Sequence, residues 1–562
     1  MNRQQVLAAI TAPGQPLEMV EMDVYGSSCR GYKNAPASLR DLFEQNLTDE
    51  TFIVFDQERY TFRDIWAHSS AIGQGLVSDY GIQKGDCVAI CMRNFPEWIM
   101  AFQAITSIGA IAVGMNSLWQ AEEIDYGLQD SGCKLLIADQ ERIDLVVKAE
   151  IQLSCETLLV RGDQTTDLPR WEDLQEKFAG NLMPTAEIAP IDDAIIFFTS
   201  GSTGRPKGVV SSNLAIMSAL LSWEVAITGW ILLRGEAPAP PEHQPAGLLA
   251  VPLFHVTGCH AIFLMAFRNQ TKLVLMRKWN PQLAAQLVEQ EKISSFTAPP
   301  AMTADLIYSA QQGGHDLSSL VMVGGGGAAR SPEQVRGIDA VFENAMPNTG
   351  WGMTETTAAA TMGFIAPKDQ ALPRDKQHAL LAKQGKSLFG IDLKVVDDNG
   401  ATLPRDGVSQ GELMVRGQWV MSRYYKSEQS ALVDGWFPTG DIATIDASGR
   451  MQIRDRSKDV IKSGGEWISS IDLENTALQH PGVAMAAVIG VKHPKWEERP
   501  LLLVVRKPET AVSKDDLLAF LAERVAKWWI PDDVVFVETL PVGGTGKVQK
   551  NELRKQFGGV FS

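Results

Sequence analysis

Short apolar runs alternate along most of the chain with longer segments of helical period. Six runs predict buried strands, at residues 87–92, 134–139, 194–200, 247–255, 272–278 and 319–327. Between them lie amphipathic segments that predict helices, such as 97–108 and 281–292. A longer apolar run at 99–115 contains polar residues and predicts a buried helix followed by a strand rather than a membrane span. The alternation predicts an α/β fold of layered sheets flanked by helices.

The pattern changes after Asp441. A hairpin-like stretch leads to Lys458, and the segment beyond it predicts a helix at 470–479, strands at 486–491 and 501–506, and a helix at 513–527. The chain has 562 residues, more than one hydrophobic core normally supports. We therefore predict a large domain at 1–457 and a small α+β domain at 458–562. The proline-rich stretch at 232–247 lacks a period and predicts a surface loop.

Composition and charge exclude several classes of protein. Apolar residues make up 45% of the chain and charged residues 21%, which is ordinary for a soluble enzyme. A net charge of -16 argues against a non-specific nucleic-acid binder, although it leaves room for a local basic pocket. The six cysteines form no C-x-x-C pair, which argues against a zinc or redox motif. With no signal-peptide pattern and no transmembrane segment, we expect a cytoplasmic protein and leave peripheral membrane association open.

A glycine-rich loop follows the apolar strand predicted at 194–198. Its sequence, T-S-G-S-T-G-R-P-K-G at 199–208, combines glycines, hydroxyl side chains and a lysine. Glycines let backbone N–H groups approach phosphate oxygens, hydroxyls add donors, and lysine adds charge. The spacing is not that of a Walker A loop, and Arg205-Pro206 interrupts the helix start that such a loop needs. The candidate polyanion-binding residues are Thr199, Ser200, Gly201, Ser202, Thr203, Gly204 and Lys207.

Further motifs follow this loop in order. They are G-G-G-G-A-A at 324–329, N-T-G-W-G-M-T-E at 348–355, G-W-F-P-T-G-D at 435–441, R-D-R-S-K-D at 454–459 and P-V-G-G-T-G-K-V-Q-K at 541–550. Together they resemble the adenylate-forming superfamily of acyl-CoA synthetases, firefly-type luciferases and peptide-synthetase adenylation domains. The chain is most similar to an AMP-forming acyl-CoA synthetase of the fatty-acid–CoA ligase type. The resemblance implies a large N-terminal domain of layered sheets and a small, mobile C-terminal lid.

The resemblance also implies roles for residues at the nucleotide. Thr354 is expected to bind the α-phosphate, Glu355 to hold Mg²⁺, and Asp441 to accept hydrogen bonds from the ribose. Trp351 stands where the family usually has tyrosine, and its indole can still stack on adenine or serve as a core residue. The residues assigned to ATP or AMP, besides the glycine-rich loop, are Gly326, Gly327, Ala328, Asn348, Gly350, Trp351, Gly352, Thr354, Asp441, Arg456 and Lys547.

Two faces of the small domain are expected to serve two half-reactions. By the resemblance, Lys547 acts in adenylation and Lys458 is the hinge. Lys462 lies on the opposite catalytic face. There Gly465 and Trp467 would border the path of coenzyme A. Each lysine taken alone could equally be a solvated charge.

The acid itself is the least defined partner. His255, in P-L-F-H at 252–255, resembles a gate between the carboxylate and coenzyme A, although a structural histidine is the alternative. The segment 252–260 offers no carboxylate to pair with an α-ammonium group, so we expect a substrate without one. Small side chains at 356–360 favour a medium- or long-chain hydrophobic acid.

The sequence therefore predicts a ligase that uses ATP, Mg²⁺ and coenzyme A. Three alternatives stay open at this point. The chain could deliver acyl-AMP to a separate carrier protein, could share only the first step with luciferases, or could be a catalytically silent nucleotide sensor. A homodimer is compatible with the sequence.

Overall fold

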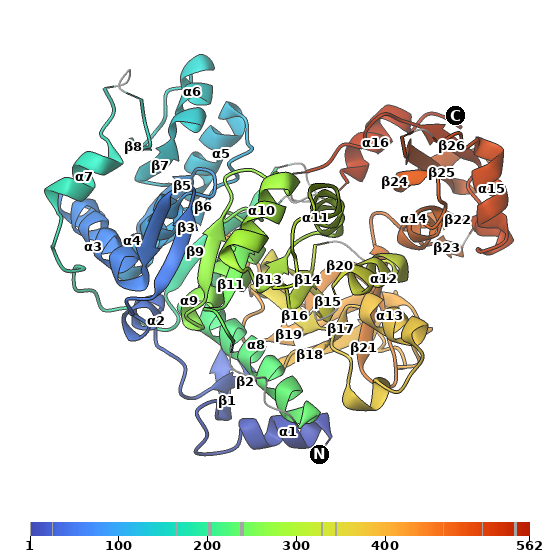
Figure 1. Cartoon of the computed structure of the whole chain (residues 1–562), viewed down its shortest axis with the longest axis horizontal. Coiled ribbons are helices and arrows are strands. Elements are labelled where there is room, and N and C mark those ends of the chain that lie inside the picture. The colour runs from blue at the N-terminus through green and yellow to red at the C-terminus, as the bar shows by residue number, and fades with distance from the viewer. Residues whose placement is uncertain are drawn as a thin grey trace.

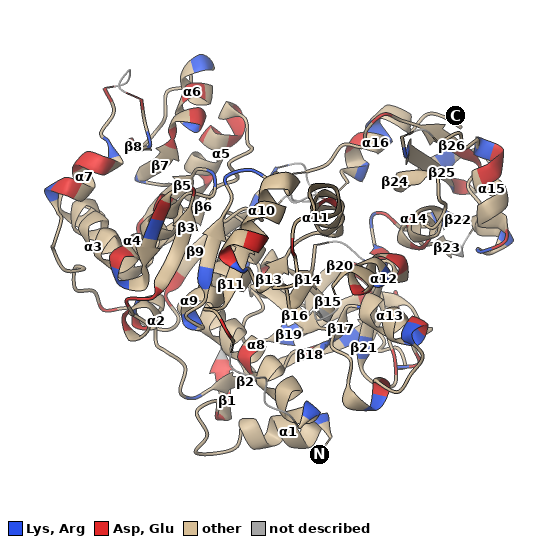
Figure 2. Cartoon of the chain, in the orientation of Figure 1, with Lys and Arg blue, Asp and Glu red and all other residues tan. Residues whose placement is uncertain are grey.

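The computed structural model describes residues 2–24, 26–163, 167–199, 205–235, 241–327, 330–342, 346–464, 466–508, 510–543 and 548–561. The chain forms a large unit that contains two extended sheets and a smaller unit at its C-terminal end (Figure 1). Charged side chains of both signs are spread over the surface helices, whereas the central strands are largely uncharged (Figure 2). This arrangement confirms the predicted fold class.

The first sheet has six strands in the order β10-β9-β6-β5-β7-β8. Five of them are parallel, and the last in sequence, β10, runs antiparallel to β9. The strands are β5 (Cys87–Cys91), β6 (Ile111–Gly114), β7 (Leu135–Asp139), β8 (Glu156–Val160), β9 (Asp193–Thr199) and β10 (Lys207–Ser212). Helix α3 (Phe62–Ser78) precedes these strands, and the helices between them are α4 (Pro96–Ser107), α5 (Ala121–Ser131), α6 (Gln140–Lys148) and α7 (Trp171–Lys177). Strands β5, β6 and β7 are buried along their whole length, which explains their unbroken apolar sequences.

The second sheet has thirteen strands and changes character along its width. Its parallel half comprises β3 (Thr51–Phe55), β12 (Lys272–Leu275), β11 (Ala246–Leu249), β13 (Ser295–Thr297), β14 (Met322–Gly325) and the start of β15 (Met346–Met353), with β4 (Glu58–Thr61) antiparallel at its edge. Its antiparallel half comprises the end of β15, β16 (Ala358–Met362), β17 (Gly385–Ser387), β21 (Arg450–Arg456), β20 (Phe437–Ile445), β19 (Gly411–Gly417) and β18 (Ile391–Val396). Strand β15 therefore joins the two halves, because Gly325 pairs with Thr349 in the parallel half and Met362 with Gly350 in the antiparallel half.

Helices cover this sheet and link it to the first one. They are α2 (Leu39–Gln45), α9 (Met265–Arg268), α10 (Pro281–Glu291), α11 (Pro300–Gly313), α12 (Pro332–Val341) and α13 (Arg374–Ala382), with short 3-10 turns at Thr354–Thr356 and Pro367–Asp369. A π-helix, η1 (Thr257–Leu264), packs against α8 (Asn213–Arg234), β11 and β16. The main hydrophobic cluster contains residues from both sheets and so joins them, while smaller clusters lie on the outer face of each sheet and beside α1.

Helix α8 is long and apolar enough to span a membrane by length and composition, with a mean hydropathy of 1.7 over its most apolar stretch. In the structure 56% of that stretch is buried inside the protein, against η1 and the N-terminal helix α1 (Arg3–Ile10). The N-terminal strands β1 (Met19–Val24) and β2 (Ser27–Tyr32) pair with each other, and β2 also contacts α8. Apolar residues surround α8 on most sides, so it gives no amphipathic period in the sequence.

The small unit has a five-stranded sheet with a hydrophobic cluster on each face. Its strands are β22 (Ile461–Ser463), β23 (Glu466–Ile468), β24 (Val483–His493), β25 (Glu497–Arg506) and β26 (Asp533–Phe536). Its helices are α14 (Ser470–Ala477), α15 (Lys514–Ala522) and α16 (Lys550–Phe557), with a 3-10 turn at Lys527–Trp529. The last strand of the large unit ends at Arg456 and the first of the small unit begins at Ile461, so the predicted boundary at Lys458 lies in the connecting turn.

Three predicted elements differ from those observed. The strand predicted at 247–255 ends at Leu249, because residues 250–255 form turns that lead into η1. The helix predicted at 513–527 ends at Ala522. The loop predicted at 232–247 begins later, because α8 continues through Arg234, while residues 236–240 lie outside the described part of the chain.

A buried asparagine joins the two sheets at the ends of their strands. The Asn94 amide follows β5 and donates to the carbonyl oxygens of Val251 (3.1 Å) and Met276 (3.3 Å), which follow β11 and β12. Its own amide oxygen accepts from the N–H of Leu253 at 2.9 Å. One side chain that follows a strand of the first sheet therefore satisfies three backbone groups in loops of the second sheet.

Asn94→Ala should destabilise the large unit by about 2–4 kcal/mol, because it leaves three buried backbone groups without partners. Calorimetry should show a lower Tm for the variant than for the parent. The matched control is Asn181→Ala at an exposed position, which should leave the Tm unchanged. Equal Tm values for the two variants would show that this joint is dispensable.

Candidate active site

Several of the predicted nucleotide residues lie where strands of both sheets end. Thr199 ends β9, Gly325 ends β14, and the Thr354–Thr356 turn follows β15 directly. Ligands in α/β proteins bind at the carboxyl ends of parallel strands, where side chains from several strands meet. The edge defined by these strands is therefore the candidate site.

The turn after β15 has an unusual backbone. Thr357 and Ala358 have φ values of 52° and 87°, in the left-handed region that residues with side chains seldom adopt. A side chain at Gly352 would overlap the carbonyl oxygen of Ala358, so glycine is required there. Strain of this kind is typical of functional sites, where the surrounding structure holds it in place.

Glu355 lies in this turn with only 7% of its surface exposed. Burial raises the pKa of its carboxyl, and the Tyr424 hydroxyl and Arg456 offset this only in part. The Tyr424 hydroxyl donates to Glu355 Oε1 at 3.2 Å. The Nζ atom of Lys207 lies 5.2 Å from the centre of the Tyr424 ring, within range of a cation–π contact. Tyr424 thus connects the phosphate-loop lysine to the predicted metal ligand, and no sequence signal singled it out.

Asp441 is the most buried of the predicted binding groups, at 2% exposure. Its Oδ1 pairs with Arg456 Nε at 2.9 Å, across the register pair that joins β20 and β21. Its Oδ2 accepts from Trp351 Nε1 at 2.7 Å. The structure therefore brings three predicted residues, from three strands, into one contact.

The Arg330 side chain supports the glycine segment that follows β14. No sequence signal pointed to this residue. The Arg330 guanidinium is buried and donates to the carbonyl oxygens of Gly324 (3.0 Å) and Asn348 (3.1 Å). It also donates to Val323 O and Thr303 Oγ1, at 3.3 and 3.1 Å. Burial lowers the pKa of Arg330 to about 10, so it stays charged at neutral pH. Arg330 fixes the two backbone segments that were predicted to face adenine.

The predicted adenine segment itself is partly described. A side chain at Gly326 would meet nothing within 4 Å, and Gly327 adopts a φ of +79° that favours glycine. Asn348 lies opposite Gly324 in β15, and Gly350 follows it at the junction of the sheet halves. The Thr199 hydroxyl donates to the Lys207 carbonyl at 3.5 Å. Eight predicted residues lie outside the described part of the chain: Ser200, Gly201, Ser202, Thr203, Gly204, Ala328, Gly465 and Lys547.

Two histidines lie in the candidate acyl region. His255 precedes η1 and its Nδ1 accepts from the Thr257 N–H at 3.2 Å. His260, one π-turn further, is fully buried against Phe197, with ring centres 5.5 Å apart. Within the described residues neither of its ring nitrogens forms a hydrogen bond of normal geometry, and burial lowers its pKa to about 3. His260 is therefore neutral at physiological pH, and Cys259 beside it is an equally buried thiol whose pKa burial raises.

Lys462 and Trp467 lie on the small unit, in a different sheet from Glu355 and Asp441. They face each other across the β22–β23 hairpin, and both side chains are exposed. The Gly464 N–H donates to the Trp496 carbonyl at 3.0 Å, which ties the hairpin to β25. Lys458 is an exposed residue of the turn that connects the two units.

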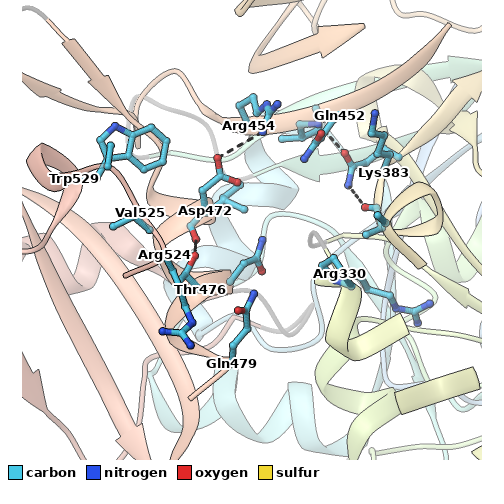
Figure 3. A pocket seen from close by; sticks show the side chains of 18 residues that line it. Arg330, Lys383, Gln452, Arg454, Asp472, Thr476, Gln479, Arg524, Val525 and Trp529 are labelled. Carbon is cyan, nitrogen blue, oxygen red and sulfur yellow. Dashed lines mark hydrogen bonds and ion pairs between the residues drawn. The ribbon is translucent and has the colours of Figure 1, made fainter. Parts of the chain in front are cut away.

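A cavity of about 550 Å³ lies between the two units (Figure 3). Side chains of α14 and of the segment after α15 face residues of α13 and β21 across it. Asp472 and Arg454 approach to 3.6 Å at one side of the cavity, as Figure 3 shows. Its lining mixes polar and apolar side chains and includes none of the predicted site residues that the structure describes.

A smaller cavity of about 150 Å³ lies at the carboxyl ends of β5, β11 and β12, next to Pro252. Its lining includes Arg93, Arg277 and Lys278. These cations share one carboxylate, Glu141, with Arg142. Burial alone would raise the pKa of Glu141, but Arg142, Arg93 and Lys278 outweigh it and lower the pKa to about 2. Positively charged side chains therefore cluster around the smaller cavity.

The chain is similar to known enzymes. The family model described as AMP-binding enzyme matches residues 42–425, and the AMP-binding enzyme C-terminal domain matches residues 472–547. A 3-methylmercaptopropionyl-CoA ligase from Ruegeria pomeroyi (strain ATCC 700808 / DSM 15171 / DSS-3) is 40% identical over 518 residues, covering 87% of this chain and 90% of the relative. A protein with the same description from Ruegeria lacuscaerulensis (strain DSM 11314 / KCTC 2953 / ITI-1157) is 34% identical over 520 residues, covering 89% and 92%.

A solved structure has the same fold. The anthranilate CoA ligase AuaEII in complex with anthranoyl-AMP superposes with a TM-score of 0.81 at 24% identity, covering 93% of this chain and 98% of that one.

The buried Glu355 carboxylate should cost stability in the absence of ligands. Its pKa is raised on folding, so the folded state loses stability as the pH rises through the ordinary range of a glutamate. Glu355→Gln should therefore have a higher Tm than the parent. The difference should be larger at about pH 7.5 than at about pH 4.5, because a larger share of the Glu355 carboxyl is protonated at the lower pH.

Calorimetry on the two proteins checks this expectation. Glu428→Gln, at an exposed position, is the matched control and should show no such pH-dependent difference. A lower Tm for Glu355→Gln at both pH values would mean that the contacts of the carboxylate outweigh its desolvation.

Proposed function

The chain belongs to the AMP-binding enzyme family and is an AMP-forming acid–thiol ligase, and from this premise we propose its substrates and the residues that act on them. The reaction is proposed to run in two steps. A carboxylate first attacks ATP to give acyl-AMP and pyrophosphate, and the thiol of coenzyme A then displaces AMP.

One observation supports the nucleotide site above all: the contact of Asp441 with Trp351 and Arg456 beside the buried Glu355. A buried carboxylate that is held by fixed partners is well suited to accept hydrogen bonds from the two hydroxyls of a ribose. Arg456 would then contact ribose and phosphate, and Thr354 the α-phosphate. The loop at 199–207 would hold the β- and γ-phosphates, with Lys207 supplying charge. Gly326, Gly327 and Asn348 would present backbone to adenine.

Glu355 fits a Mg²⁺ ion that is bound mainly by phosphates. Among the described residues, no three His, Cys, Asp or Glu side chains converge on a metal site. Mg²⁺ usually takes one or two carboxylates and fills its other positions with phosphate oxygens and water. The ion would neutralise phosphate charge, and Glu355, fixed by the strained turn and by Tyr424, would orient it.

Charge repulsion is the main barrier of the first step, because a carboxylate must attack an anionic phosphate. We propose that Lys547 offsets it. A lysine near 4 Å from the reacting oxygens contributes about 4 kcal/mol at an effective dielectric constant of about 20. That energy corresponds to roughly three decades of rate. Pyrophosphate leaves as the carboxylate oxygen bonds to the α-phosphorus.

Two features support coenzyme A as the acceptor. Trp467, 36% exposed on the β22–β23 hairpin, offers an apolar wall for a pantetheine chain. The cations of the smaller cavity, Arg93, Arg277 and Lys278, suit the phosphates at the other end of the molecule. Rotation about Lys458, in the turn between the units, would exchange the Lys547 face for the Lys462 face. A carrier protein bearing phosphopantetheine is the second candidate, because an acidic partner could also use these cations.

The acid is proposed to be short, in the range of 3-methylmercaptopropionate, rather than long. Both Ruegeria relatives act on that acid by their descriptions. The small side chains at 356–360, which from the sequence favoured a longer acid, are buried except for Ala359, which is partly exposed. Ala360 is fully buried in the main core, and β16 packs against η1 and α8. The Trp223 indole of α8 reaches the Ala359 carbonyl at 3.4 Å. Tight packing of this wall favours a small substrate. The cytoplasmic location and the homodimer stay predictions.

Lys547→Ala should lose acyl-adenylate formation by about a thousandfold while keeping thioester formation from supplied acyl-AMP. Pyrophosphate exchange measures the first step, and acyl-CoA formation from synthetic acyl-AMP measures the second. Lys462→Ala is the matched variant on the other face and should spare the exchange reaction. Equal loss of both steps in either variant would contradict the division of labour between the faces.

A panel of acids tests the substrate. Pyrophosphate release should give the highest kcat/KM with 3-methylmercaptopropionate or an unbranched acid of similar length, and values at least about tenfold lower with palmitate. Replacing coenzyme A by pantetheine should raise KM for the thiol, because pantetheine lacks the phosphates that Arg93, Arg277 and Lys278 are proposed to bind. A preference for palmitate would overturn the proposed substrate, and equal KM values for the two thiols would argue against the role of the basic cavity.

A further inference from the structure

Trp351 holds the carboxylate proposed to bind ribose. Its indole Nε1 donates to Asp441 Oδ2 at 2.7 Å, a short distance for an N–H donor and typical of a bond to a charged acceptor. Both partners are nearly inaccessible to solvent, at 8% and 2% exposure. A hydrogen bond to a charged group in such a place is stronger than one at the surface.

The second partner of Asp441 is less constrained. Arg456 pairs with Oδ1 at 2.9 Å, but 42% of its side chain is exposed. Exposed ion pairs contribute little and are easily displaced by solvent or ligand. The Trp351 bond is therefore the contact that fixes the orientation of the carboxylate.

The local backbone directs the indole to this point. The register of the β15–β16 pair shifts between Trp351 and Gly352, which is a bulge next to the junction of the two sheet halves. Bulges redirect side chains and are common beside active sites. The Trp351 N–H donates to Thr361 Oγ1 at 3.0 Å, which anchors the bulge to β16. Side chains at Gly350 or Gly352 would press on the backbone carbonyls of Thr361 or Ala358.

Counting acceptor sites shows what this arrangement leaves free. A carboxylate has about four lone-pair directions, two on each oxygen. Among the described residues, Trp351 donates to one direction on Oδ2, and Arg456 forms an ion pair with Oδ1 that is counted as taking one direction there. One direction on each oxygen remains, which matches the two neighbouring hydroxyls of a ribose. Only a donor on the ring edge can hold Oδ2 in this way, and phenylalanine has none.

We propose that Trp351 is a positioning residue that fixes Asp441 for recognition of both ribose hydroxyls, and so sets the preference for ribonucleotides over 2′-deoxynucleotides. The proposal rests on the proposed function, in which Asp441 binds ribose. Stacking of the indole on adenine is a separate effect and would act equally on both kinds of nucleotide. The two effects can therefore be separated with a nucleotide analogue.

The test compares ATP with 2′-deoxy-ATP in pyrophosphate exchange for the parent and Trp351→Phe. Loss of the indole donor should lower kcat/KM about tenfold with ATP but less than about threefold with 2′-deoxy-ATP. The preference for ATP should thus shrink at least threefold. Equal losses with the two nucleotides would overturn the proposal, since stacking or packing would then explain the whole effect.

Two matched variants make the outcome unambiguous. Trp230→Phe removes an indole that donates to the Ile365 carbonyl at 3.3 Å, away from Asp441, and should leave the nucleotide preference unchanged. Asp441→Asn should itself reduce the preference. If it does and Trp351→Phe does not, only this inference fails; if neither does, the ribose role of Asp441 fails as well.

Direct binding protects the test against loss of activity. Calorimetric Kd values for AMP and 2′-deoxy-AMP give the same ratio without turnover, and the Tm of each variant reports its folding. In the Asp441→Asn background, adding Trp351→Phe should change this ratio no further. Additive changes in the double variant would contradict action through Asp441.

Discussion

Burying charge at the end of a β-sheet is the constraint on which the site depends. Asp441, Glu355 and Arg330 are all nearly inaccessible, and an isolated charge in such a place is strongly unfavourable. Each one is compensated by donors or acceptors from a different strand or loop. Trp351 and Arg456 serve Asp441, and Tyr424 serves Glu355. Backbone carbonyls serve Arg330. The site therefore exists only when these segments, far apart in sequence, have reached their places.

The junction of the two sheet halves in β15 determines where these buried groups lie. The strand pairs in parallel with β14 up to Thr349 and then in antiparallel fashion with β16. The parallel half brings Gly324 and Asn348 together, as α/β sheets do at their carboxyl ends. The antiparallel half brings the end of β15 near β20 and β21, where Asp441 and Arg456 face each other. One strand thus connects the segment proposed for adenine with the carboxylate proposed for ribose.

The sequence predicted those parts that short-range signals encode. Unbroken apolar runs identified β5, β7 and β9, and the motifs at 348–355 and 435–441 identified residues that meet in space. Tyr424 and Asn94 escaped prediction because their partners are distant in sequence, and Arg330 because its partners are backbone carbonyls and a hydroxyl that no sequence motif marks. Helix α8 escaped for a different reason. This helix is apolar on most sides, so its sequence shows no amphipathic period. Its packing against η1 and α1 explains its apolar composition.

The contact between the two units consists of polar interactions that other polar contacts or water can replace. The Ser470 N–H donates to Asp455 Oδ2 at 2.5 Å, and the Ser469 hydroxyl donates to the Arg454 carbonyl at 2.6 Å. Next to these bonds lie the partly exposed pair of Arg454 with Asp472 and a cavity of about 550 Å³ that separates part of the two surfaces. Exposed pairs and hydrated polar surfaces contribute little net stability, because water replaces each lost contact. A wide apolar interface would instead fix the units, since its exposure on rotation costs about 25 cal/mol per Å². The ion pair and the cavity at this contact therefore suit the rotation of the small unit that we propose.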